Sequence, residues 1–273
     1  WGSTFFATTS LFAFIGSWTS HRIVHRRSSL FLLGVSSVVL ALGFALMSRA
    51  QTLTTLLPAC ALFGWGFGAL NLAQNVMVYE GSASRLRRRL FSGLHSMYGL
   101  AALLAPVVAS LFRWMGASWR DCFLVLALLP ILVALGGTRL RTTQQVAEPT
   151  KRGLNFSEWI YCALFSCMMA FYLWGEISAT TRMVQWLRAD LNFTPDQANL
   201  YLGGFSLAIL LGRIFFSLMH FEGVDNWRIL LVSAVLSCAL YMLGLRHSPL
   251  WFLPCGLAMS PFFPVAMEQV SVT

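Results

Sequence analysis

The chain has 273 residues, of which 57% are hydrophobic and only 11% charged, and its mean hydropathy is +0.68. Soluble globular domains have about 25% charged residues, so a soluble enzyme, a disordered chain and a secreted disulfide-rich domain all fit this composition poorly. The net charge of +9 would suit a nucleic-acid partner only if the basic residues formed a stripe on a soluble surface. They lie instead in short clusters between long apolar runs, so we expect a polytopic membrane protein and no nucleic-acid partner.

Nine apolar stretches are long enough, at roughly 20 residues each, to cross a bilayer as helices. Each is continuously apolar rather than alternating with a period of two, which favours helices over the strands of a barrel. The predicted spans are 1–20, 29–48, 52–79, 91–112, 119–138, 157–187, 197–219, 228–246 and 249–268. The predicted fold class is therefore all-α, a transmembrane bundle of about nine helices.

The charged loops predict how the bundle is divided and oriented. Most of the 19 Lys and Arg residues fall in one set of alternate loops, which the positive-inside rule places in the cytoplasm. The longest polar stretch, 139–156, predicts a cytoplasmic linker between an N-terminal half (1–138) and a C-terminal half (157–273). A faint repeat, in which Gly16 corresponds to Gly212, relates the two halves, as in many secondary transporters.

Several short motifs occur in an order typical of one known family. They are Gly16 to Arg27 (GSWTSHRIVHRR), Asn71 to Asn75 (NLAQN), Leu90 to His95 (LFSGLH), Gly175-Glu176, Leu211 to Arg213 (LGR) and Ser260 to Pro264 (SPFFP). Their order and spacing resemble the fucose permease-like branch of the major facilitator superfamily, whose members are sugar–proton symporters. The chain departs from that pattern at Ser20, where the family usually has Asp, at Asn71, where the symporters have a carboxylate, and at Arg182, where Trp is usual.

The resemblance implies a transporter that works by alternating access of two rocking halves. On this mapping the nine spans correspond to helices 2–10 of twelve, and the sequence is expected to be a fragment that lacks helices 1, 11 and 12. The expected partners are a small polar solute such as a sugar, protons and membrane lipids. The expected location is the inner membrane, where the protein would act as a monomer.

Glu176 is the leading candidate for chemistry. A carboxylate within a membrane span is costly and marks a functional site by default, and desolvation suits a group that takes up and releases protons. The alternative is a structural Glu that caps or pairs with a neighbouring helix, with Arg182, six residues on, as one candidate partner. Arg182 either binds substrate through its planar fork of donors or reaches the outer headgroups from the interface. Arg213 is expected to be a structural gate or an interfacial residue.

Three amides and a histidine complete the predicted substrate-binding set. Asn71 and Asn75 are four residues apart and share a helix face, with Gln74 beside them. They either hydrogen-bond solute hydroxyls or join neighbouring helices. His95 lies at a similar depth in the next span, where it either completes the polar site and relays protons or serves only as a helix contact.

Two other functions compete with sugar–proton symport. Because Asn71 and Arg182 change the chemistry of the site, a drug or metabolite efflux carrier of the same superfamily is the main alternative. A lipid-modifying membrane enzyme is a remote one, since the loops offer His21 and His25 without a nearby acid. The sequence contains no Walker A, HExxH, GxSxG or dinucleotide fingerprint, and its six cysteines lack metal-ligand spacing. We therefore expect no enzyme activity, no cofactor and no metal.

Overall fold

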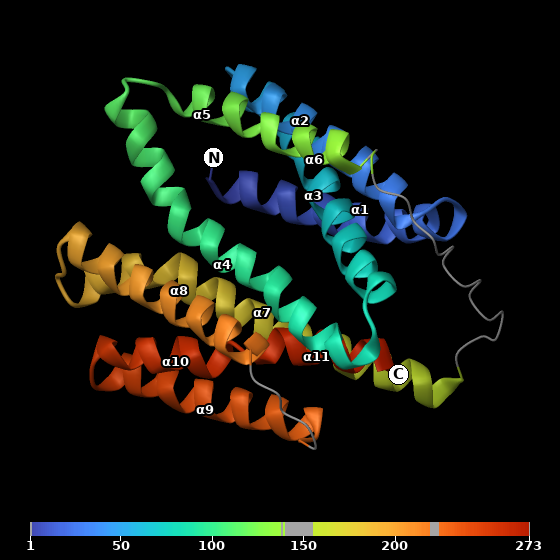
Figure 1. Ribbon diagram of the computed structural model, residues 1–273. Coiled ribbons are helices and arrows are strands. Elements are labelled where there is room, and N and C mark those ends of the chain that lie inside the picture. Colours follow the sequence, from blue (N-terminus) through green and yellow to red (C-terminus); the bar gives the residue numbers. More distant parts are fainter. Residues whose placement is uncertain (1, 138, 140–154, 219–223, 273) are drawn as a thin grey trace. The chain divides into compact units, whose positions relative to one another are not determined.

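The computed structural model describes residues 2–137, 139, 155–218 and 224–272, and in these ranges the regular structure is helical (Figure 1). A helical segment occupies each of the nine predicted apolar stretches. The helices are α1 (Gly2–Arg26), α2 (Ser29–Arg49), α3 (Leu53–Gly81), α4 (Ser84–Trp114), α5 (Trp119–Leu126), α6 (Leu128–Gly137), α7 (Phe156–Asp190), α8 (Pro195–Leu218), α9 (Asn226–Arg246), the short 3-10 helix η1 (Pro249–Trp251), α10 (Phe252–Met259) and α11 (Phe262–Val272).

Polar residues set the points at which several helices begin. Ser28 caps α2, because its hydroxyl accepts from the backbone N–H of Phe31. At α7, Asn155 and Glu158 form a reciprocal capping box. Each cap satisfies backbone donors that the first helical turn leaves without an intrahelical acceptor.

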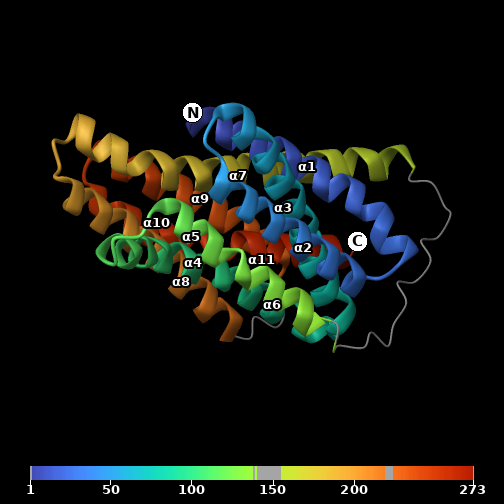
Figure 2. The ribbon, with the colours of Figure 1, turned by 90° about the horizontal axis from the view of Figure 1, so that it is seen from above.

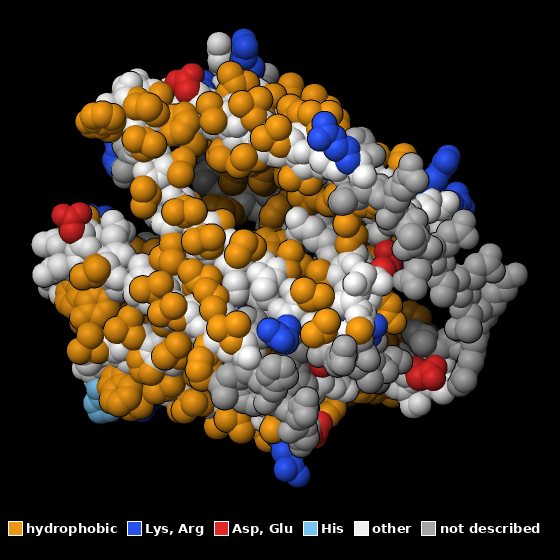
Figure 3. Space-filling model, in the orientation of Figure 1, with side chains coloured by type: hydrophobic (Ala, Val, Ile, Leu, Met, Phe, Trp, Pro, Cys, Tyr) orange, Lys and Arg blue, Asp and Glu red, His pale blue; other side chains and the backbone are white. Residues whose placement is uncertain are grey.

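Seven segments of the described residues are long and apolar enough to cross a membrane. They are Ser29–Arg49, Leu53–Gly81, Trp119–Gly137, Phe156–Asp190, Pro195–Phe216, Asn226–Arg246 and Pro249–Gln269. The remaining two predicted spans, 1–20 and 91–112, lie in helices α1 and α4. Many large apolar side chains are exposed, and Figure 3 shows them spread over the visible surface. The prediction of an all-α, multi-pass membrane bundle is confirmed.

The first compact unit comprises Trp1–Gly81 and Val107–Lys151. In it α3 packs against both α1 and α2, while α5 and α6 run beside α2, as Figures 1 and 2 show. Side chains also join α1 to α3: the hydroxyl of Ser17 donates to the carbonyl oxygen of Gly68 at 3.0 Å, and the indole N–H of Trp65 donates to Thr19 Oγ1 at 3.0 Å. Close helix packing through small residues is how membrane bundles gain van der Waals contact.

The second compact unit comprises Ser82–Pro106 and Arg152–Thr273. Its α10 packs against α8 and α9, and its α7 against α8. One buried apolar cluster is centred on Leu187, Phe205 and Phe252, and a second contains Phe216 and Phe262. The first part of α4 therefore packs with helices that follow the predicted linker. Most of that linker, 140–154, lies outside the described residues.

Candidate functional site

The predicted site residues divide between the two compact units. Asn71, Gln74 and Asn75 lie on α3 in the first unit, whereas His95 on α4 and Glu176 on α7 lie in the second. Within the second unit, the structure brings His95 and Glu176 to one residue that the sequence analysis did not include in the site, Arg213 on α8.

Glu176 and Arg213 form an ion pair in which Arg213 is buried and Glu176 is half-buried. Arg213 Nη2 donates to Glu176 Oε1 at 3.0 Å and lies 3.4 Å from Oε2. The two side chains are 20% and 6% exposed respectively. Breaking such a pair by removing one partner leaves an uncompensated buried charge, which costs about 3–5 kcal/mol. Pairing therefore allows both charged groups to be accommodated within apolar helices.

Arg213 also ties α8 to α4. Its Nη1 donates to the carbonyl oxygen of His95 at 3.2 Å, and the hydroxyl of Ser92 donates to the carbonyl oxygen of Arg213 at 2.6 Å. The ring of His95 meets the ring of Phe263 edge-on, with centroids 4.2 Å apart. Two buried nitrogens in this cluster, Arg213 Nε and His95 Nε2, have no hydrogen-bond partner. The cluster therefore holds polar groups that are ready to bind a further ligand or water.

Two contacts hold α7 and α8 in place beside this cluster. Tyr172, one turn before Glu176 on α7, donates its hydroxyl to the carbonyl oxygen of Met259 at 2.8 Å and stacks on Phe262 with centroids 4.1 Å apart. At the residue before Arg213, a Cβ on Gly212 would collide with the side chain of Ser260. The missing side chain thus allows α8 to approach the end of α10 closely.

Two of the α3 amides donate to carbonyl oxygens of their own helix. Asn71 Nδ2 donates to the carbonyl oxygen of Phe67 at 3.1 Å, and Asn75 Nδ2 donates to the carbonyl oxygen of Asn71 at 2.9 Å. Asn75 Oδ1 is buried without a partner, and Gln74 is half-buried on the same helix. The Nδ2 groups of Asn71 and Asn75 thus each bond a carbonyl one turn back, while Asn75 keeps an unsatisfied acceptor on α3.

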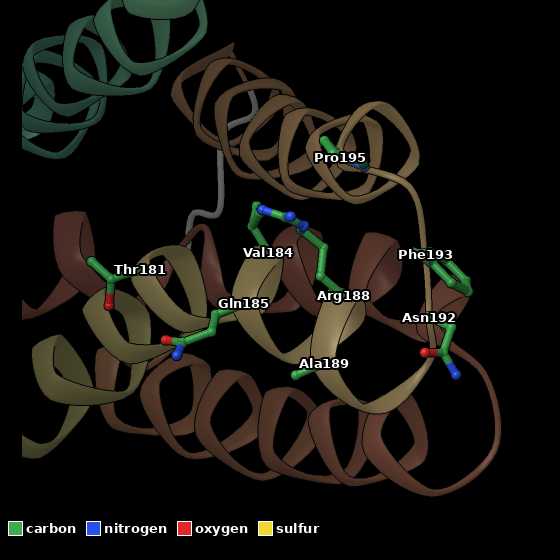
Figure 4. Close-up of a pocket in the computed structure, with 8 residues that line it drawn as sticks. All are labelled: Thr181, Val184, Gln185, Arg188, Ala189, Asn192, Phe193 and Pro195. Atoms are coloured by element: carbon green, nitrogen blue, oxygen red, sulfur yellow. The ribbon is translucent and has the colours of Figure 1, made fainter.

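Arg182, one candidate partner of Glu176 from the sequence, is not the residue that pairs with it. It is exposed, and its Nη1 donates to Gln185 Oε1 at 3.0 Å. Gln185 lines an open pocket of about 700 Å³ at the turn from α7 to α8, shown in Figure 4. The pocket is lined by Thr181, Val184, Gln185, Arg188, Ala189, Asn192, Phe193 and Pro195.

Two residues of the cluster were not predicted from the sequence. They are Arg213, the partner of Glu176, and Ser92, which bonds to the backbone of Arg213. The signal for Arg213 was present, since it is a cation inside the apolar run LAILLGRIFFSL and such residues pair with an opposite charge or a carbonyl. No sequence signal distinguished Ser92 from the many other serines of the spans.

A model of one protein family matches almost the whole chain. The model of the major facilitator superfamily matches residues 1–272. The chain belongs to the major facilitator superfamily. Members of this family are membrane transporters rather than enzymes, in agreement with the expectation from sequence.

One relative and two solved structures are similar to the chain. It is 22% identical over 188 residues to an uncharacterized MFS-type transporter of Yersinia pestis, a match that covers 66% of this chain and 46% of the relative. The chain thus spans about half the length of that relative. It is similar to a crystal structure of FucP in the outward conformation, with a TM-score of 0.77 and 14% identity over 98% of this chain and 74% of the other. A variant of the Escherichia coli fucose:proton symporter FucP gives a TM-score of 0.79 and 15% identity over 97% and 75% of the two chains. At these identities the structures show the fold, which is of the major facilitator type.

Proposed function

We propose that the protein is a proton-coupled secondary transporter of a sugar or a similar small polar solute. Its mechanism would be alternating access of two halves, 1–138 and 157–273, joined by the linker 139–156. We further propose that it acts as a monomer in the inner membrane. The observation that carries this proposal is the ion pair between Glu176 and Arg213.

The ion pair supports proton coupling, because protonation of Glu176 changes what holds the helices together. An ionised Glu176 attracts Arg213 on α8, whereas a protonated carboxyl group can only hydrogen-bond to it. Arg213 in turn contacts α4 through the carbonyl oxygen of His95. A proton taken up at Glu176 would therefore weaken an attraction that connects α7 to α8 and, through α8, to α4. Intramembrane carboxylates commonly serve proton relays in this way.

The polar face of α3 supports a solute rich in hydroxyl groups. Asn71, Gln74 and Asn75 supply amides, and each amide both donates and accepts hydrogen bonds, as a sugar hydroxyl does. The unpartnered, buried Oδ1 of Asn75 is an acceptor that such a hydroxyl would satisfy. One structural neighbour is a fucose:proton symporter, and fucose belongs to the same class of solute.

The test uses the full-length protein in liposomes that contain a pH-sensitive dye. A panel of hexoses, pentoses and sugar acids is added outside, and proton influx is followed. We expect a solute-dependent proton flux that is lost in Glu176→Gln. The matched control is Asp190→Asn, which removes an exposed carboxylate from the same helix and should leave the flux intact.

Two outcomes would contradict the proposal. If no solute of the panel moves protons through correctly folded protein, the function shifts to efflux or to uncoupled transport. If Glu176→Gln retains the full flux, Glu176 is a structural residue and the coupling site lies elsewhere.

A further inference from the structure

We propose that Arg213 is the anchor for an acidic solute, whose carboxylate replaces Glu176 on the guanidinium once Glu176 has taken up a proton. This inference rests on the proposed proton-coupled transport and deepens it by naming the class of substrate. The solute anion and the proton would bind together, so that the loaded site carries no net charge.

The charge balance of the cluster is the first argument. The groups that can carry charge around Glu176 are Arg213 on α8 and His95 on α4, with Tyr172 on its own helix. With Glu176 ionised, the single negative charge matches the guanidinium. When Glu176 is protonated, Arg213 remains as a buried cation, 6% exposed, without a counter-charge. Buried charges are stable only when paired, so the protonated state favours the binding of an anion.

The geometry of the guanidinium is the second argument. Glu176 contacts Arg213 through Nη2 alone, with both carboxylate oxygens directed at that nitrogen. Nη1 is occupied by the carbonyl oxygen of His95, whereas Nε is buried and has no partner. Nε and Nη2 form the edge of the planar group that a carboxylate binds with two parallel hydrogen bonds. Glu176 therefore uses only part of this edge, and a carboxylate that replaces it can use both donors.

His95 carries the second unpartnered nitrogen of the cluster. Its side chain is 7% exposed and its Nε2 has no hydrogen-bond partner, although its backbone oxygen holds Arg213. The edge-on contact with Phe263 restricts the ring, so its free nitrogen is held in one place. A hydroxyl group near the carboxylate of the solute would satisfy this nitrogen, whichever tautomer the ring adopts.

The two partners differ in exposure. Glu176 is 20% exposed, against 6% for Arg213, so Glu176 is the more accessible partner. A neutral sugar could hydrogen-bond there but could not replace the lost negative charge. The favoured class is a small hydroxylated carboxylate, such as a sugar acid.

The experiment measures binding as a ligand-induced thermal shift of the full-length protein in detergent. D-gluconate and D-galacturonate are compared with the neutral sugar D-galactose at about pH 5 and about pH 8, on either side of the neutral range. For one proton bound with each anion, linkage predicts affinity that rises up to about tenfold per unit fall of pH where Glu176 takes up its proton. We expect the two acids to bind at the lower pH and to lose affinity at the higher pH.

Two variants separate the role of Arg213 from a general effect on folding. Glu176→Gln frees the guanidinium permanently, so the acids should bind at both pH values. The double variant Glu176→Gln/Arg213→Gln keeps the site neutral and close in size, and it should bind neither acid at either pH. Thermal unfolding without solute checks that both variants are folded.

Each remaining result overturns the inference. If the acids bind the double variant as they bind the parent, Arg213 is not the anchor. If only D-galactose binds and drives a proton flux, the inference is wrong while the proposed symport stands. If neither acids nor sugars bind or move protons, both proposals fall.

Discussion

The Cα of Gly68 on α3 lies against the main chain of Ala13 on α1, so close that a Cβ on Gly68 would overlap the Ala13 carbonyl. At the same position the Gly68 carbonyl oxygen accepts a hydrogen bond from Ser17. The absence of one side chain thus allows α1 and α3 to pack backbone to backbone.

Gly68→Ala should therefore destabilise the protein. A methyl group inserted into a packed contact typically costs about 1–3 kcal/mol, and here the opposing group is main chain that cannot rotate away. The control is Gly34→Ala on α2, where the added Cβ meets nothing within 4 Å. Because alanine is a better helix former than glycine, the control should be neutral or slightly stabilising. Denaturant unfolding in detergent compares the two variants, and equal stabilities would contradict the close packing of α1 and α3.

Ser92→Ala should weaken the attachment of α4 to α8. The variant loses the bond from the Ser92 hydroxyl to the carbonyl oxygen of Arg213, and a hydrogen bond of this kind contributes about 0.5–1.5 kcal/mol. Ser96→Ala is the matched control, because Ser96 is equally buried but donates within α4, to the carbonyl oxygen of Ser92. Hydrogen exchange of the α4 amides should increase more in the first variant. The interpretation fails if both variants exchange alike.

Arg213→Leu should destabilise the protein strongly, by about 3–5 kcal/mol, since it leaves Glu176 without its counter-charge among apolar helices. The double variant Glu176→Leu/Arg213→Leu should recover most of that loss, because an apolar pair of similar volume can replace a buried ion pair at little cost. Unfolding of the parent, of Arg213→Leu, of Glu176→Leu and of the double variant completes the thermodynamic cycle. If the double variant loses as much free energy of unfolding as the two single variants together, the two side chains do not stabilise each other.

The pKa of His21, beyond the predicted first span, should depend on its neighbour His25. Their Nε2 atoms are 3.0 Å apart, and the pKa of His21 is lowered from its ordinary 6.5, first by partial burial and then by the charge of His25. The folded state therefore binds this proton less tightly than the unfolded state, so the contribution of His21 to stability falls as pH drops through 6.5.

His25→Gln should raise the pKa of His21 toward its ordinary value without restoring it fully, because burial is the larger cause. Histidine NMR titration of the labelled protein in detergent measures the pKa of His21 in the parent and in the variant. A His21 pKa unchanged by His25→Gln would mean that the two rings are not electrostatically coupled.

Hydropathy alone located the helices well but not their interruptions. The predicted span 249–268 is divided into η1, α10 and α11, with a break at Ser260 and Pro261. Proline has no N–H to donate to the carbonyl oxygen of Leu257, and the Ser260 hydroxyl donates to that oxygen instead, at 2.8 Å. The span 119–138 is likewise divided, into α5 and α6. Breaks of this kind depend on individual backbone bonds, which an averaged hydropathy does not register.

The chemistry of the site was harder to predict than the helices. The cost of a charge inside a span was enough to select Glu176 from the sequence. Its partner depended on how α7 and α8 are rotated about their axes, and a chain that is apolar on every face carries little information about rotation. For that reason the sequence allowed Glu176 to pair with a neighbouring helix and offered Arg182 as one candidate, but it did not identify Arg213 as the partner.

The hydroxyl of Ser92 donates to the backbone carbonyl oxygen of Arg213, so this bond does not involve the guanidinium of Arg213. Any residue at position 213 offers the same carbonyl oxygen, so the bond from Ser92 does not depend on the side chain there, whereas the bond from Arg213 Nη1 to the His95 carbonyl oxygen does. The polar chemistry of the cluster can therefore change by substitution, as in a carrier that acquires a new solute, while the Ser92 bond between these two helices is kept.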